Sequence, residues 1–220
     1  VACGFHASDP DVMAKTVFMA KKLGVAVGAH PGYPDLVGFG RRNMALSLEE
    51  TKHAVMYQIG ALDAFCRAAG LKMQHVKAHG ALYNTAGDNL EVATAIAEAI
   101  KMVNPELYML CLANSQMVTA AKNVGIPYVE EAFADRAYTE KGTLVSRKLA
   151  GSVIHDVDEV VKRVLMMVKE KQVISIDGKV VPLNAQTICV HGDSPGAVQM
   201  VTALRAAFEK EGISLKAFGK

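Results

Sequence analysis

Short apolar runs alternate with longer segments of helical periodicity along the whole chain. Apolar runs of about four to eight residues are typical of buried strands, whereas apolar residues repeated every three or four positions indicate one face of a helix. The predicted strands are residues 1–5, 25–29, 74–78, 108–112, 128–133 and 187–190. The predicted helices are residues 10–23, 48–69, 90–103, 115–123, 157–171 and 195–211. Strands separated by helices predict an α/β fold on a parallel sheet, either open or closed into a barrel.

Local signals mark several ends of these elements. Asp9 stands just before a proline, in the position of a helix N-cap. Ser47 is followed three residues later by Glu50, which is the pattern of a capping box. Residues 173–183 alternate around an Asp-Gly pair at positions 177 and 178, a pattern that predicts a β-hairpin.

Composition narrows the class of protein. A chain of 220 residues with 51% hydrophobic content fits a single domain over residues 1–220. The net charge of +2 comes from interspersed charges, so we expect neither nucleic acid nor a membrane surface as a partner. No apolar stretch is long enough to span a bilayer. The cysteines lie far apart and predict reduced, buried thiols in a cytoplasmic protein: Cys3, Cys66, Cys111 and Cys189.

Polar residues gather where the predicted strands end. The carboxyl ends of these strands carry five of them: His6, His30, His79, Asp135 and His191. In βα folds this edge of the sheet carries the active site, because the loops that follow the strands converge there. The remaining histidines outside these segments, His53 and His155, are interpreted as structural.

A second pattern lies within one predicted strand. His75, Lys77 and His79 are two residues apart, so a strand would point all three side chains to one face. A buried lysine is costly without an anion, so Lys77 suits a carboxylate or a phosphoryl group of a substrate. The alternative is an internal salt bridge from Lys77 to Asp135 or Glu131.

Eight motifs resemble those of the LamB/YcsF family. They occupy residues 2–7, 28–35, 38–42, 57–62, 75–77, 79–84, 131–138 and 190–193. The resemblance implies a seven-stranded, distorted β/α barrel of the glycoside hydrolase/deacetylase type. The family normally begins with an acidic strand that this sequence lacks, so we expect the first strand to be missing and the domain to be N-terminally incomplete relative to the family.

The resemblance also implies an activity. Members of the family open the lactam ring of 5-oxoproline to give L-glutamate at the expense of ATP, together with partner subunits B and C. Such a reaction needs an electrophilic carbonyl, a base for water and an acid for the leaving nitrogen. The sequence has no G-x-x-x-x-G-K-[ST] motif, so we expect ATP-binding and phosphoryl transfer to belong to the partners.

The catalytic candidates follow from this chemistry. His191 and Asp193 are two residues apart and predict a base with a carboxylate neighbour, although Asp193 could instead cap the following helix. Asp135 is a candidate acid/base, and Lys77 is a catalytic candidate that suits a carboxylate or a phosphoryl group. Arg136 beside Asp135 predicts a bidentate anion clamp, or alternatively a structural bridge between loops.

The candidates for substrate binding all lie in the family motifs. They are His6, His30, Arg41, Arg42, His75, His79, Tyr83, Arg136 and Tyr138. Arg41 and Arg42 follow a glycine-rich turn and could grip the substrate carboxylate. His6 and His30 could instead be two imidazole ligands of a divalent metal, as in the deacetylases, or neutral hydrogen-bonding residues of the pocket.

Two other functions compete with this one. The first is a metal-dependent deacetylase or amidohydrolase that acts alone. The second is a non-catalytic subunit that holds catalytic partners together. The sequence also leaves open whether the chain forms a homo-oligomer.

Overall fold

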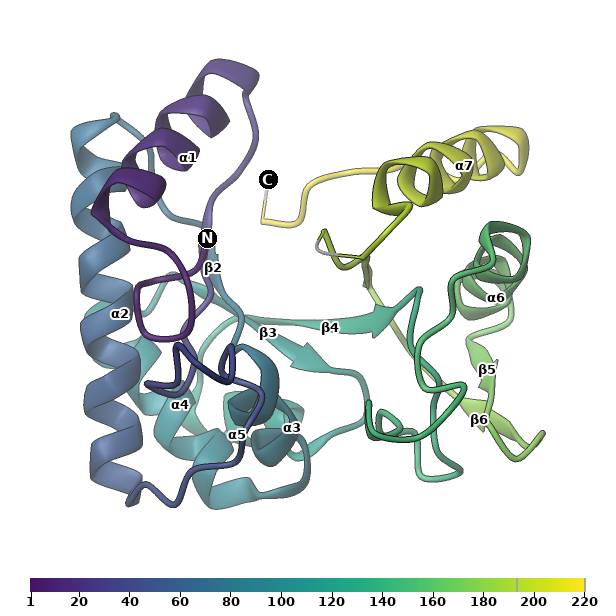
Figure 1. Cartoon of the computed structure of the whole chain (residues 1–220), viewed down its shortest axis with the longest axis horizontal. Coiled ribbons are helices and arrows are strands. Elements are labelled where there is room, and N and C mark those ends of the chain that lie inside the picture. Colours follow the sequence, from purple (N-terminus) through teal and green to yellow (C-terminus); the bar gives the residue numbers. More distant parts are fainter. Residues whose placement is uncertain (193, 220) are drawn as a thin grey trace. The chain divides into compact units, whose positions relative to one another are not determined.

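The computed structural model describes residues 1–192 and 194–219, and the chain folds into two compact units (Figure 1). Unit 1 comprises Val1–Cys111 and Gln116–Tyr128, and unit 2 comprises Leu112–Ser115 and Val129–Lys220. The elements up to residue 124 are α1 (Pro10–Leu23), β1 (Gly28–Ala29), α2 (Leu48–Ala68), β2 (His75–Val76), α3 (Gly80–Asp88), α4 (Leu90–Val103), β3 (Tyr108–Leu112) and α5 (Gln116–Val124). The later elements are β4 (Tyr128–Phe133), α6 (Val157–Lys169), β5 (Gln172–Ile174), β6 (Val180–Pro182), β7 (Thr187–Cys189) and α7 (Ala197–Lys210).

The described strands form a five-stranded sheet of order β1-β2-β3-β4-β7 and a separate two-stranded sheet. Strands β1 and β2 pair in parallel, as do β2 and β3, and β4 and β7. The two-stranded sheet is the antiparallel hairpin of β5 and β6, as the Asp-Gly signal predicts. A parallel sheet with helices between its strands confirms the predicted α/β fold class.

Local sequence signals set the helix starts. The Asp9 side chain accepts a hydrogen bond from the backbone N–H of Val12 at the start of α1. Ser47 and Glu50 form the complete capping box of α2, because each side chain binds the other's backbone N–H. These bonds use backbone donors that the first turn of a helix leaves unpaired.

The strands near the amino end are shorter than predicted. Strands β3 and β4 begin and end where the sequence predicts, whereas the predicted strands over residues 25–29 and 74–78 keep only two residues each. The predicted strand over residues 1–5 is wrong, since only Ala2 forms an isolated bridge, to His30. The prediction also missed α3, whose glycines and polar residues resemble a loop. The chain leaves the sheet early here to form the turns that carry the histidines.

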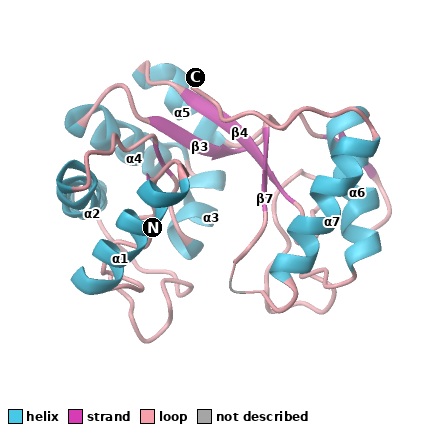
Figure 2. Ribbon diagram, turned by 90° about the horizontal axis from the view of Figure 1, so that it is seen from above, coloured by secondary structure: helices cyan, strands magenta, loops and turns pink. Residues whose placement is uncertain are grey.

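Each unit has its own apolar core. In unit 1, α4 packs against both α2 and α5. In unit 2, α6 and α7 lie side by side (Figure 2) and close over a cluster that includes Val160, Val164, Met200 and Phe208. Burial of each such side chain contributes about 1.5–3 kcal/mol. The cluster also includes Ala134, so this core anchors the backbone next to Asp135.

Candidate functional site

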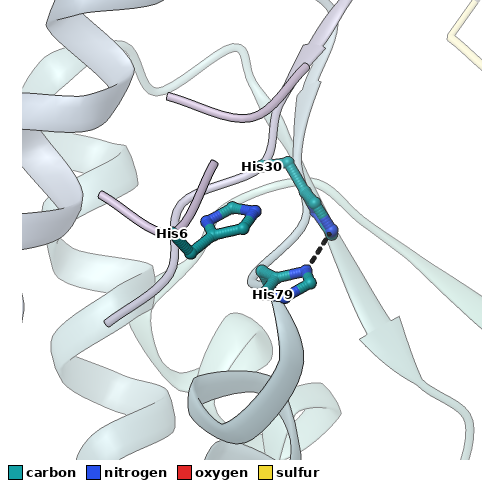
Figure 3. A group of neighbouring side chains, drawn as sticks. All are labelled: His6, His30 and His79. Atoms are coloured by element: carbon teal, nitrogen blue, oxygen red, sulfur yellow. Dashed lines mark hydrogen bonds between the residues drawn. The ribbon is translucent and has the colours of Figure 1, made fainter. Parts of the chain in front are cut away.

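Three histidines meet in unit 1, and Figure 3 shows their rings together. His30 follows β1, His79 stands at the N-cap of α3, and His6 belongs to the first turn of the chain. One ring nitrogen from each residue lies within 4.8 Å of the others. The sequence predicts each of them as a site residue, but it predicts only His6 and His30 as metal ligands. His79, the third member, was predicted to bind substrate and not metal.

Backbone carbonyls orient two of the rings. The Nδ1 atom of His30 lies 2.7 Å from the carbonyl oxygen of Lys77, and the Nε2 atom of His79 lies 2.8 Å from that of Phe39. A carbonyl oxygen can only accept a hydrogen bond, so both of these nitrogens carry a hydrogen. The other two nitrogens, Nε2 of His30 and Nδ1 of His79, lie 3.0 Å apart.

Burial keeps His6 and His30 neutral. His6 stacks on His79 with ring centroids 3.8 Å apart, and Phe39 packs edge-on against both rings. Burial, followed by the charge of His79, lowers the pKa of His6 to about 3. Burial also holds the pKa of His30 well below its ordinary value. Neutral imidazoles retain a lone pair, which is what a ligand or a hydrogen-bond acceptor needs.

The backbone around these rings leaves no room for a Cβ atom at two of its glycines. A Cβ atom at Gly40 would lie 2.8 Å from both His6 Cβ and His79 Cδ2, and one at Gly32 would lie 2.7 Å from His6 Nδ1. Gly40 also has φ +62°, which favours glycine. Phe39 itself has φ +53°, which is uncommon for a residue with a side chain. The glycine-rich loop is therefore shaped around the histidine rings.

Two polar side chains hold that loop in place. Arg42 binds the buried carboxylate of Asp35, which also accepts the backbone N–H of Gly38. The hydrogen bond from Arg42 lowers the pKa of Asp35 to about 2. The buried side chain of Gln58 pairs with both the N–H and the carbonyl of Gly32. The sequence did not indicate Asp35 or Gln58 as residues of the site. Asp35 binds partners in its own loop, whereas Gln58 binds a glycine 26 residues away in the sequence.

The two candidate arginines of this loop differ in their surroundings. The guanidinium of Arg41 lies 4.9 Å from the centre of the Phe39 ring. The guanidinium of Arg42 is committed to Asp35, which favours a structural role over a grip on substrate. Arg41 remains the stronger candidate for an anion of the two.

The second predicted pattern, over residues 75–79, is only partly formed. Strand β2 ends at Val76, so the strand alternation that was expected to continue to His79 is absent. The His75 ring covers Gly28, and its Nδ1 lies 3.1 Å from the side-chain oxygen of Gln74. Burial lowers the pKa of His75 to about 4. His75 is therefore not a member of the three-histidine cluster.

Two further candidates of this segment face each other. The ammonium nitrogen of Lys77 lies 5.8 Å from the centre of the Tyr83 ring, within the range of a cation–π contact. Tyr83 is buried in α3. The Lys77 carbonyl thus binds His30 of the cluster, and the Lys77 side chain lies near the Tyr83 ring.

In unit 2 a histidine is paired with a carboxylate. The Nδ1 atom of His191 lies 2.8 Å and 2.9 Å from the two carboxylate oxygens of Asp135. The side chain of Asp135 is 0% exposed and that of His191 is 20% exposed. The His191 ring stacks on Phe133, and the hydroxyl of Ser194 donates to Asp135 at 3.3 Å. The sequence predicts Asp135 and His191 as catalytic but did not indicate Ser194.

The pKa of Asp135 reflects two opposing effects. Burial acts to raise it, while the hydrogen bond and charge of His191 lower it, and the result is a pKa below the ordinary value. The carboxylate is therefore ionised near neutral pH. An ionised carboxylate on Nδ1 fixes the histidine with its hydrogen there and leaves Nε2 as the basic nitrogen.

The other candidates of unit 2 have structural contacts. The guanidinium of Arg136 donates to the carbonyls of Val145 and Ser152, which favours its role as a bridge between loops. The hydroxyl of Tyr138 accepts the backbone N–H of Phe133, and burial raises the pKa of Tyr138. Asp193, predicted as catalytic, lies outside the described residues.

The sequence predicts that the four cysteines are reduced and buried. All four are free, and three of them are buried. None of the helices in the described parts of the chain is long and apolar enough to cross a membrane.

Comparison with known proteins decides the family. The family model described as "LamB/YcsF family" matches residues 1–220. The chain belongs to the LamB/YcsF family. The family resemblance seen in the sequence motifs is therefore confirmed over the whole chain.

Similar proteins carry consistent names. The chain is 56% identical to the A subunit of 5-oxoprolinase from Clostridium beijerinckii, over 98% of this chain and 84% of that protein. It is 53% identical to the A subunit of 5-oxoprolinase from Acinetobacter baylyi, over 99% of this chain and 86% of that protein. A solved structure, the lactam utilization protein from Thermus thermophilus, superimposes with a TM-score of 0.91 at 47% identity. That match covers 99% of this chain and 87% of the other, and it confirms the fold that the resemblance implies.

Proposed function

We propose that this chain acts as the A subunit of a 5-oxoprolinase, which cleaves 5-oxoproline to L-glutamate with hydrolysis of ATP. The names of the similar proteins support the substrate. The observation that carries the catalytic part is the pairing of a buried Asp135 carboxylate with a partly exposed His191. A histidine held in this way is the usual arrangement of a general base.

The pair can perform both proton transfers of the reaction. His191 takes a proton from water through Nε2 while its Nδ1–H stays bound to Asp135, whose charge stabilises the imidazolium. The water oxygen forms a bond to the lactam carbonyl carbon, and the ring C–N bond then breaks. The imidazolium returns the proton to the leaving nitrogen, which becomes the amine of glutamate. The histidine is thus restored to its neutral form at the end of the cycle.

ATP makes the carbonyl carbon more electrophilic when its terminal phosphoryl group is transferred to the lactam oxygen and ADP leaves. Ring opening then gives the γ-phosphate of glutamate, from which a second water releases inorganic phosphate and L-glutamate. We assign this transfer to partner subunits B and C, because the chain lacks a phosphate-binding G-x-x-x-x-G-K-[ST] motif. The division of labour places water attack and ring opening on this chain. It also makes activity depend on the assembled complex.

The test is release of glutamate from 5-oxoproline by the full-length protein mixed with its candidate B and C subunits, with and without ATP. We expect release only with ATP and all three subunits. The variant His191→Ala should lower kcat by about 10²–10⁴-fold, the usual contribution of a general base. His155→Ala is the matched control, since His155 is an exposed histidine of the same unit.

Each outcome bears on a different part of the proposal. No release by the assembled wild-type complex would reject the substrate. ATP hydrolysis by this chain alone, in proportion to the 5-oxoproline consumed, would reject the assignment of phosphoryl transfer to the partners. Full activity of the His191→Ala complex would reject the catalytic role and favour a subunit that only holds its partners together.

A further inference from the structure

The geometry points to a binding site for one divalent transition-metal ion of the zinc class, held by His6, His30 and His79 in unit 1. The inference rests on the hydrogen bonding of the three rings. It does not depend on the reaction proposed above, because the Asp135 and His191 pair lies in unit 2.

In neutral rings, no hydrogen lies between the facing nitrogens of His30 and His79. The Nδ1 atom of His30 and the Nε2 atom of His79 both donate to carbonyl oxygens, so in neutral rings the other two nitrogens carry lone pairs. These two nitrogens are 3.0 Å apart (Figure 3). Two lone pairs at this distance repel each other. The arrangement becomes attractive when a cation lies where both lone pairs can reach it.

His6 favours a metal ion over a shared proton as that cation. A proton between His30 and His79 would satisfy only two rings. The Nδ1 atom of His6 is buried and has no hydrogen-bond partner among the described residues, although its ring lies against His79. A metal ion accepts a third imidazole, and three protein ligands with one open position are typical of catalytic zinc sites.

The outer hydrogen bonds match those of known metal sites. Metal-bound histidines almost always donate their other N–H to a carbonyl, a carboxylate or water, which fixes the ring orientation. His30 does so to Lys77 and His79 does so to Phe39. The unusual backbone of Phe39 (φ +53°) holds the second of these carbonyls in place. The two rings are therefore oriented before any ion arrives.

One ring must turn for the ion to bind. The planes of His6 and His79 differ by only 3°, and a lone pair lies in the plane of its ring. No point between two stacked, parallel rings lies in both planes, so an ion there cannot face both lone pairs. The His79 ring is tied to Phe39, so we expect His6 to be the ring that turns.

The charges nearby indicate what fills the open position. Lys77 and Arg41 are both close enough to act electrostatically on the histidines of the cluster. A divalent cation would add to this positive charge. An anion such as hydroxide or a carboxylate would therefore be the favourable fourth ligand.

The experiment is metal titration of the full-length protein after removal of bound metal with a chelator. Binding of Zn²⁺ is measured by calorimetry. Binding of Co²⁺ is measured by visible absorption, which reports whether the ion is four-coordinate. We expect one ion per chain. Loss of even an outer partner costs about 10–100-fold in metal affinity, so His30→Gln and His79→Gln should each weaken binding by at least about 100-fold. His53→Gln is the matched control, because His53 is an exposed histidine of the same unit.

A second measurement does not depend on the folding of variants. In the wild-type protein, nitrogen NMR of the histidines should show Zn²⁺ bound to Nε2 of His30 and Nδ1 of His79. The opposite nitrogens should keep their hydrogens. Absence of binding by the wild-type protein, unchanged binding by folded Gln variants, an equal loss in His53→Gln, or ligation through the opposite nitrogens would each overturn the site.

Discussion

The two units use the same side chain in two different ways. In unit 2, His191 donates to a buried carboxylate, whose negative charge stabilises a protonated ring. In unit 1, His30 and His79 donate to backbone carbonyls, which orient the rings without supplying a full charge. The partner of the ring decides its chemistry, because a carboxylate suits a base that gains a proton and a carbonyl suits a neutral ligand.

We expect the largest effect from removal of the Asp135 carboxylate charge in unit 2. Asp135→Asn keeps the shape of the side chain but loses the carboxylate that stabilises the imidazolium. We expect kcat of the assembled complex to fall by about 10²–10⁴-fold. Zn²⁺ titration of the same variant should remain unchanged, and a parallel loss of metal binding would show that the two regions are not chemically separate.

Crowding of the loop in unit 1 should have the next largest effect. Gly40→Ala places a Cβ 2.8 Å from His6 and His79 and forces φ +62° on a residue with a side chain. We expect the free energy of unfolding in urea to fall by about 1–3 kcal/mol.

The control for this change is Gly60→Ala in α2, where an added Cβ meets nothing within 4 Å. Alanine is the better helix former by about 0.5–1 kcal/mol, so this variant should be neutral or slightly more stable. Equal destabilisation by both changes would contradict the close packing around the histidines.

Removal of the Gln58 side chain, which binds Gly32, provides a further test of the packing in unit 1. Gln58→Ala leaves the buried N–H and carbonyl of Gly32 without their side-chain partners. Unsatisfied buried groups cost about 1–3 kcal/mol, which we expect in the urea unfolding free energy. His6 packs against Gly32, so Zn²⁺ affinity should weaken as well, while Asp135 and His191 keep their contact. Unchanged stability would mean that water replaces the amide.

The smallest expected effect is on acid stability. Arg42 lowers the pKa of Asp35 from 3.8 to about 2 in the folded chain. Because the pKa of Asp35 is lower in the folded chain than in the unfolded chain, its carboxylate stabilises the fold at pH values above about 4. This stabilisation is lost as the pH falls from about 4 to about 2. Arg42→Ala should abolish the part of the pH dependence that lies in this window, as measured by urea midpoints. An identical pH profile would show that solvent screens the ion pair from its exposed side, that of Arg42.

Local signals in the sequence were sufficient for much of the secondary structure. The caps at Asp9 and Ser47 form as predicted, and β3 and β4 keep their predicted bounds. These features depend on contacts between residues close in sequence, such as a side chain and a backbone N–H three positions away. The same patterns failed for α3, whose glycines and polar residues favour a loop in isolation.

The sequence by itself predicted the candidate histidines and Asp135 at the ends of strands, although the strand predicted before His6 does not form. Only the tertiary structure decided which of them meet. His30 and His79 are 49 residues apart, and Asp135 and His191 are 56 apart. Such pairs depend on strand register and on the turns that follow, and the hydrogen bonds made there decide which ring nitrogen of each histidine carries the hydrogen. A linear pattern carries the residue types, but the chemistry of each ring follows from the partner that folding brings to it.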